Sequence, residues 1–163
     1  MVKFAIYTFL GFILESMYVS IWKHKIYFSG LLKGPFIPIY GFGSLIILSL
    51  APYCINNFDV FFFSLITCTF LEYLTHYFLL HDSKIEIWNY EQLKLNYHHR
   101  ICMFYSLIWG CLGIFLVNYL DPFITNIILQ CNYDLLSTIA SIYFLIIIYQ
   151  FYQQQFNHQL NRG

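Results

Sequence analysis

The chain has 163 residues, of which 60% are hydrophobic and only 10% charged, and its formal net charge is zero. A soluble domain carries about 25% charged residues because its surface faces water, so this composition argues against a water-soluble globule. No basic stripe with interleaved aromatic residues is present, and the sequence therefore gives no support for nucleic-acid binding.

In chain order, five apolar stretches approach the roughly 20 residues that a helix needs to cross a bilayer. They are residues 4–22, 36–55, 60–80, 101–120 and 135–152. Asp121 and Pro122 follow the fourth stretch, and we expect them to end that helix. The expected fold is all-α, an integral membrane helical bundle of about five transmembrane helices that forms one domain over residues 1–163, with the lipid bilayer as its surroundings.

The segment before the second span, residues 30–43, reads GLLKGPFIPIYGFG. Its four glycines and two prolines argue against a continuous regular helix. At membrane depth, irregular backbone is tolerated only where protein or a water-filled cavity satisfies its polar groups. One interpretation is a broken or re-entrant segment that lines a cavity before helix two. The other is an ordinary interfacial loop followed by a glycine-rich packing face.

The basic residues predict how the chain is oriented, since Lys and Arg near helix ends favour the cytoplasmic side. With five spans and an outside N-terminus, Lys3 alone lies outside and seven basic residues lie inside: Lys23, Lys25, Lys33, Lys84, Lys94, Arg100 and Arg162. We therefore expect a multi-pass protein of the cytoplasmic membrane whose C-terminus is cytoplasmic.

Glu15 and Glu72 are the charged residues within the predicted spans. A carboxylate at membrane depth is costly, so it indicates a functional site by default. Glu15 lies eight residues before Lys23 and Glu72 nine before His81, which places both roughly 12–13 Å from the cytoplasmic ends of their helices. The two could line one cavity that opens to the cytoplasm.

Other polar residues accompany these glutamates. His76 lies one helical turn after Glu72, and Arg100 begins the fourth span with a side chain long enough to reach a carboxylate. The alternative to a functional cavity is that a glutamate pairs with Arg100 or His76 and only holds helices together.

Familiar catalytic signatures are missing from the sequence. It contains no G-x-x-x-x-G-K-[ST] run and no G-x-S-x-G elbow. The five cysteines show no C-x-x-C spacing, and the six histidines match no metal signature. We expect no cofactor, no metal site and, on balance, no enzyme.

Several motifs resemble a bacterial family, that of the putative ABC-transporter type IV or CmpB-like permeases. They are Gly11-Phe12-Ile13-Leu14-Glu15, the run GPFIPIYGFG at residues 34–43, Leu71-Glu72-Tyr73-Leu74-Thr75, Trp88-Asn89-Tyr90, Asn96, Arg100-Ile101-Cys102 and Ser106-Leu107-Ile108-Trp109-Gly110. The resemblance covers residues 8 to 115 in the family's order. It implies a multi-pass bacterial membrane protein with a transport role, which could work with an ATPase, with another membrane subunit or as a homo-oligomer.

The chain departs from the family pattern at three places. Phe28-Ser29-Gly30 stands where the family has Asn-Arg-Gly, His99 stands where a glycine precedes the arginine, and residues 88–91 read Trp-Asn-Tyr-Glu in place of Trp-Asp-Tyr-Ser. A basic and an acidic residue are thus replaced together, which suggests that a polar contact of the relatives is missing here.

Our leading hypothesis is a transport subunit whose cytoplasm-facing polar cavity binds a cation, a proton or a polar group of a substrate. The cavity candidates are Glu15, Glu72, Arg100, His76, Tyr40, Gly34, Pro35, Pro38, Gly41 and Trp109. One alternative is an intramembrane lipid-handling protein or enzyme that uses a glutamate as general base, with basic residues at the inner interface holding an anionic head group. The other is a non-catalytic scaffold of a membrane complex.

Overall fold

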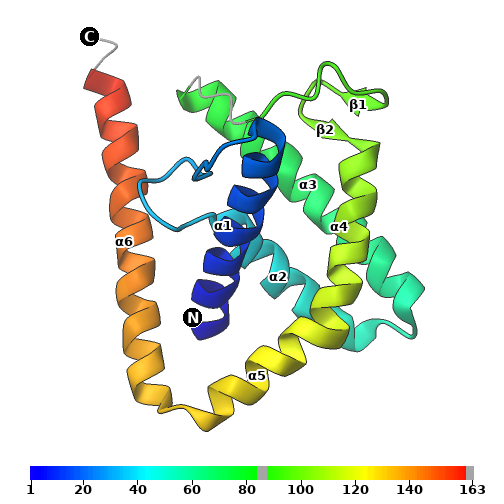
Figure 1. The fold of residues 1–163 in the computed structure, drawn as a ribbon, viewed down its shortest axis with the longest axis vertical. Coiled ribbons are helices and arrows are strands. Elements are labelled where there is room, and N and C mark those ends of the chain that lie inside the picture. Colours follow the sequence, from blue (N-terminus) through cyan, green and yellow to red (C-terminus); the bar gives the residue numbers. More distant parts are fainter. Residues whose placement is uncertain (84–87, 161–163) are drawn as a thin grey trace. The chain divides into compact units, whose positions relative to one another are not determined.

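The computed structural model describes residues 1–83 and 88–160, and side chains within 1–80 and 88–154. Helices account for most of the described chain (Figure 1). The elements are α1 (Val2–Lys23), α2 (Pro38–Leu50), the 3-10 turn η1 (Ala51–Tyr53), α3 (Asn57–Ser83), β1 (Asn96–Tyr97), β2 (Ile101–Cys102), α4 (Met103–Phe115), the π-helical turn η2 (Leu116–Leu120), α5 (Asp121–Gln130) and α6 (Tyr133–Leu160).

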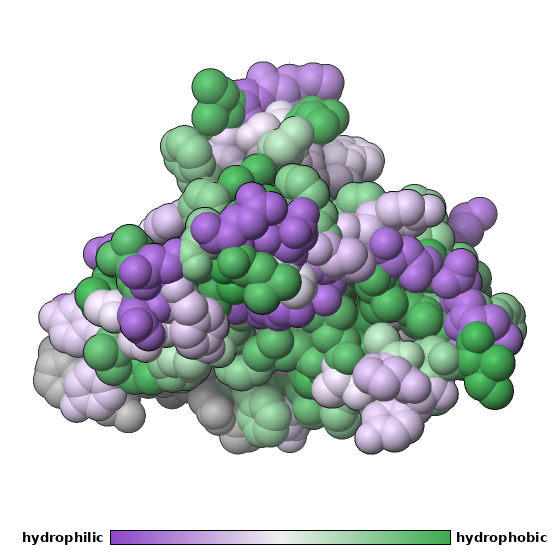
Figure 2. All heavy atoms as spheres, turned by 90° about the horizontal axis from the view of Figure 1, so that it is seen from below, coloured by the Kyte–Doolittle hydropathy of each residue, from purple (hydrophilic) through white to green (hydrophobic). Residues whose placement is uncertain are grey.

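Four stretches of helix in the described chain are long and apolar enough to cross a membrane: Val2–Lys23, Asn57–Leu80, Met103–Gln130 and Tyr133–Gln154. Many of their large apolar side chains are exposed, as lipid contact requires. Figure 2 shows hydrophobic residues reaching the surface over much of one face, interrupted by hydrophilic ones. The predicted fold class, an all-α membrane helical bundle, is confirmed.

The end of the fourth predicted span is wrong. Asp121 and Pro122 do not stop the helix, because α4, η2 and α5 continue from Met103 to Gln130. Proline has no N–H to offer the carbonyl four residues earlier. The π-helical turn Leu116–Leu120 precedes Asp121 and Pro122. Such a turn changes the spacing of the backbone hydrogen bonds, and local adjustments of this kind let a helix continue past a proline.

The second predicted span, residues 36–55, is shorter in the structure. Helix α2 begins at Pro38, and the apolar helical stretch ends at Tyr53. At about 1.5 Å per residue it covers roughly 24 Å, less than the hydrocarbon core of about 30 Å. The residues before Pro38 are irregular, so a crossing at this place would need part of that irregular segment.

The described chain divides into two compact units. Unit 1 comprises Met1–Phe42 and Ile128–Gly163, and unit 2 comprises Gly43–Ile127. The prediction that residues 1–163 form one domain stays a prediction.

Unit 1 pairs α1 with α6, and the two helices run in the same direction (Figure 1). Its core contains Phe4, Leu32, Phe36 and Ile147. Phe36 and Leu32 come from the irregular segment between α1 and α2, so the later part of that segment is packed into the unit, whereas residues 24–28 at its start are exposed. Helix α1 ends where His24 adopts a left-handed conformation with φ of 49°.

Unit 2 is built on an antiparallel pair, α3 and α4. The helices approach closely because α4 has glycines on the face that contacts α3. A Cβ added at Gly110 would overlap the ring of Phe61, and one added at Gly113 would overlap Ser64. The Thr69 hydroxyl donates a 2.8 Å hydrogen bond to Ser106 Oγ across the same interface. The strands β1 and β2 form a small antiparallel hairpin just before α4.

Candidate functional site

Glu72 lies in unit 2 on α3, and only 3% of its surface is exposed. Two aromatic side chains bind its carboxylate. The Tyr90 hydroxyl donates to Oε1 at 2.7 Å, and the Trp109 indole N–H donates to Oε2 at 3.3 Å. Both oxygens of this membrane-depth carboxylate therefore accept a hydrogen bond from a neutral donor.

Further rings surround these contacts. Tyr90 stacks on Tyr105 with ring centroids 4.9 Å apart. His76, one helical turn after Glu72, is 2% exposed and lies against Trp88, with ring centroids 5.5 Å apart. Glu72 and His76 thus both lie buried among aromatic side chains.

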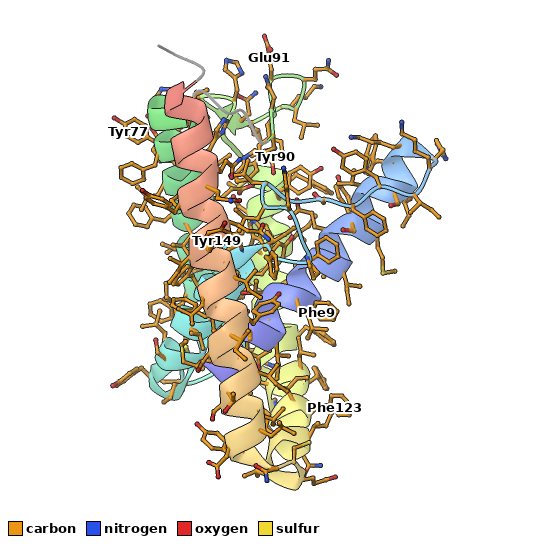
Figure 3. All side chains as sticks on the ribbon, turned by 90° about the vertical axis from the view of Figure 1, so that its left-hand side faces the viewer. Phe9, Tyr77, Tyr90, Glu91, Phe123 and Tyr149 are labelled. Carbon is orange, nitrogen blue, oxygen red and sulfur yellow. The ribbon has the colours of Figure 1, made fainter. Side chains whose placement is uncertain are left out.

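The segment of residues 88–102 holds Tyr90 in place. The Tyr90 amide donates to the His99 carbonyl at 2.9 Å, and the Trp88 indole N–H donates to the Arg100 carbonyl at 2.8 Å. His98 and His99 adopt positive φ in the turn of the β1–β2 hairpin. Figure 3 shows Glu91 at the outer tip of this segment and Tyr90 below it, on the side of the helices.

Arg100 contacts tyrosines of α3. Its Nη1 donates to the Tyr73 hydroxyl at 3.2 Å, and its guanidinium lies 5.3 Å and 5.2 Å from the ring centroids of Tyr73 and Tyr77. The sequence led us to expect that this side chain reaches toward a carboxylate. In the structure its charge faces aromatic rings.

Glu15 belongs to unit 1 and is half-buried on α1. The Ser29 hydroxyl donates to Glu15 Oε1 at 2.8 Å, and the Tyr40 side chain also hydrogen bonds this carboxylate. Next to it, the Ser29 amide donates to the Ser16 hydroxyl at 3.0 Å. Glu15 therefore fastens the irregular segment to α1, a helix long and apolar enough to cross a membrane.

The irregular segment of residues 24–37 reaches far along α1. The Ile37 amide donates to the Thr8 carbonyl at 3.5 Å, and Thr8 lies 15 residues before Lys23, or about 22 Å along the helix. Gly30 and Gly34 adopt φ of 122° and 152°, which other residues rarely do.

Side chains of α6 satisfy the carbonyls of this segment. The Tyr143 hydroxyl donates to the Pro35 carbonyl and the Gln150 amide to the Lys33 carbonyl, each at 2.6 Å. Irregular backbone at membrane depth needs partners of this kind because no bulk water is available there.

The run GPFIPIYGFG is packed against α1 from Pro38 onward. Pro38 is the first residue of α2, a position where its missing N–H costs nothing. A Cβ added at Gly41 would overlap Thr8 and Phe4, and one added at Gly11 would overlap Tyr40. The glycines of this motif therefore allow α2 to approach α1 closely.

The structure thus brings Tyr40, Gly34, Pro35, Pro38 and Gly41 into the same unit as Glu15, and His76, Trp109 and Arg100 into the same unit as Glu72. The shared cavity that opens to the cytoplasm stays a prediction. Lys84, Arg162 and His81 lie outside the residues whose side chains are described. Sequence reasoning did not single out Ser29 or Tyr90 as glutamate partners. Tyr90 stands in a motif of the resembled family, and Ser29 occupies a position where the chain departs from that family's pattern.

Comparison with known proteins gives one match. The family model described as Putative ABC-transporter type IV matches residues 2–154, which includes both glutamates and every element from α1 to most of α6. No curated protein matches the chain. No solved structure matches it either.

Proposed function

Because the chain belongs to the Putative ABC-transporter type IV family and is a multi-pass membrane protein, we propose that it is a permease-like subunit of a transport system. In this function Glu15 and Glu72 bind a cation or a proton during transport. The family's description favours an ATPase or a second membrane subunit as partner.

The observation that carries the proposal is the setting of the two carboxylates. Each lies within a helix long enough to cross the membrane, and hydroxyl or indole groups donate to each: Ser29 and Tyr40 to Glu15, Tyr90 and Trp109 to Glu72. Neutral donors orient a carboxylate without cancelling its charge. A carboxylate held in this way keeps its negative charge available for a cation.

The irregular segment supports the proposal from a second direction. Transport sites near the middle of the membrane commonly use interrupted helices, whose exposed backbone groups line the path of the cargo. Residues 24–37 descend to the level of Thr8 before α2 begins, and Glu15 hydrogen bonds Ser29 within them. A carboxylate fastened to an irregular segment can respond to cargo by releasing that segment.

The proposed orientation has an outside N-terminus and a cytoplasmic C-terminus. The parallel course of α1 and α6 in unit 1 (Figure 1) supports an odd number of crossings, which places the two chain ends on opposite sides of the membrane. The excess of basic residues on the predicted cytoplasmic side then favours a cytoplasmic C-terminus.

Electrical recording from proteoliposomes on a solid-supported membrane tests the function. Steps in pH, Na⁺ or K⁺ are applied, and we expect a protein-dependent charge displacement for at least one of them. In Glu15→Gln and in Glu72→Gln the displacement falls to the level of protein-free liposomes. Tyr97→Phe, which changes an exposed hairpin ring, retains it. If the natural chain displaces no charge with any of the three cations, the proposal is wrong.

A further inference from the structure

We propose that Glu72 and His76 form a proton-binding site, so that the proton is the cation taken up in unit 2. The inference rests on the proposed function for its role in transport. Proton binding itself is measured without transport, so the two can fail independently.

The burial of both side chains favours a proton over a larger cation as the bound species. Glu72 is 3% exposed and His76 is 2% exposed. A metal ion with its ligands, or an organic cation, occupies volume and would have to displace the rings that enclose these two residues. A proton adds to an oxygen or nitrogen already present and needs no additional volume.

The chemistry of the pair also fits. Carboxylate and imidazole are the side chains that most often carry protons through membrane proteins, and residues four apart on a helix face each other. The bound proton is placed on a Glu72 oxygen, one helical turn from the His76 imidazole, and its uptake breaks no other bond. Tyr90 and Trp109 hold the carboxylate in a fixed orientation by donating to its two oxygens.

The other titratable groups around Glu72 do not compete for this role. Cys68 lies one turn earlier on α3, on the same face as Glu72. Tyr90 faces it from residues 88–102, with Tyr105 of α4 stacked behind. Thiols and phenols are ordinarily neutral near neutral pH, and Arg100 is turned to Tyr73 and Tyr77. Protonation of Glu72 is therefore the change that alters charge at this site.

Infrared difference spectroscopy of the purified protein in lipid tests the inference. The probe is the proton alone. The pH is changed between values that all lie above about 6, where exposed carboxyl groups stay ionised. We expect the carbonyl stretch of a protonated carboxylic acid that changes intensity with pH and shifts in D₂O. The band is lost in Glu72→Gln and is retained in Glu15→Gln. Circular dichroism verifies that each variant keeps the helical content of the natural chain.

The Tyr90 hydrogen bond supplies a second signature. In Tyr90→Phe the Glu72 carbonyl loses its 2.7 Å donor, so its stretch moves to higher frequency. Tyr97→Phe, in the β1–β2 hairpin, leaves the stretch unmoved. A wild-type spectrum without such a band, a band unchanged in Glu72→Gln, or a band unmoved in Tyr90→Phe would overturn the inference. Charge displacement without the band would leave the transport function standing, and the band without charge displacement would leave only the proton site.

Discussion

The Tyr143 hydroxyl donates a 2.6 Å hydrogen bond to the Pro35 carbonyl, 108 residues earlier in the chain. This bond joins the last helix to the irregular segment before α2. Two turns further along α6, the Gln150 amide donates to the Lys33 carbonyl in the same segment. These contacts explain how non-helical backbone persists beside apolar spans, since its carbonyls would otherwise lack partners.

Replacing Tyr143 by Phe should therefore destabilise unit 1. The Pro35 carbonyl would lose its partner, and the loss of this half-buried hydrogen bond costs about 0.5–1.5 kcal/mol. Equilibrium unfolding in mixed detergent micelles measures the change. Tyr149→Phe is the matched control, because its exposed hydroxyl accepts a bond only from Gln153 on the same helix among the hydrogen bonds described. Equal losses in the two variants would contradict the assigned contact.

The bond between Ser29 and Glu15 should appear as a coupling energy. Ser29→Ala, Glu15→Ala and the double variant form a thermodynamic cycle, which isolates the pair because each change removes the interaction. We expect a coupling of about 1–2 kcal/mol for this charge-assisted hydrogen bond. The free energy of unfolding of each protein gives the value. Strictly additive effects would show that the 2.8 Å contact contributes nothing.

The close approach of α3 and α4 should depend on Gly113. A Cβ at this position would overlap Ser64, which is fully buried, so Gly113→Ala should destabilise unit 2 by roughly 1–3 kcal/mol through overpacking.

Gly43→Ala serves as the control for this prediction. Its added Cβ would meet Cys68 and Leu71 at 3.6 Å and 3.7 Å, which is ordinary contact, and alanine has the better helix propensity. Thermal denaturation in detergent should rank Gly43→Ala at or above the natural chain and Gly113→Ala well below it. The reverse order would show that the two helices are not in this contact.

Much of the fold could be predicted from the sequence because hydrophobic length determines where a chain can cross a bilayer. The starts of the first and third spans agree with α1 and α3 to within three residues. Glu15 and Glu72 could be recognised as candidates because a charged side chain within an apolar span has a high free-energy cost. Pro122 misled us because proline usually ends a helix, and only the π-helical turn before it shows how the helix continues.

The contacts of the candidate sites were less predictable. Ser29 and Tyr90 lie in connecting segments, where no periodicity relates a residue to a helix face, so nothing in the sequence tied either to a particular glutamate. Tyr143 lies more than a hundred residues from its partner. By contrast, Trp109 and Tyr40 stand in motifs that already directed attention to them, and the structure gives each a glutamate to bind.

Native mass spectrometry of the protein, extracted gently from its own membrane, tests the transport function most directly. We predict that an ATPase or a second membrane subunit remains bound. Glu72→Gln should retain that partner, because Glu72 is buried within unit 2 and its proposed role is to bind the cargo. A lone chain or homo-oligomer that carries a bound lipid in place of a protein partner would contradict the account and point to lipid handling.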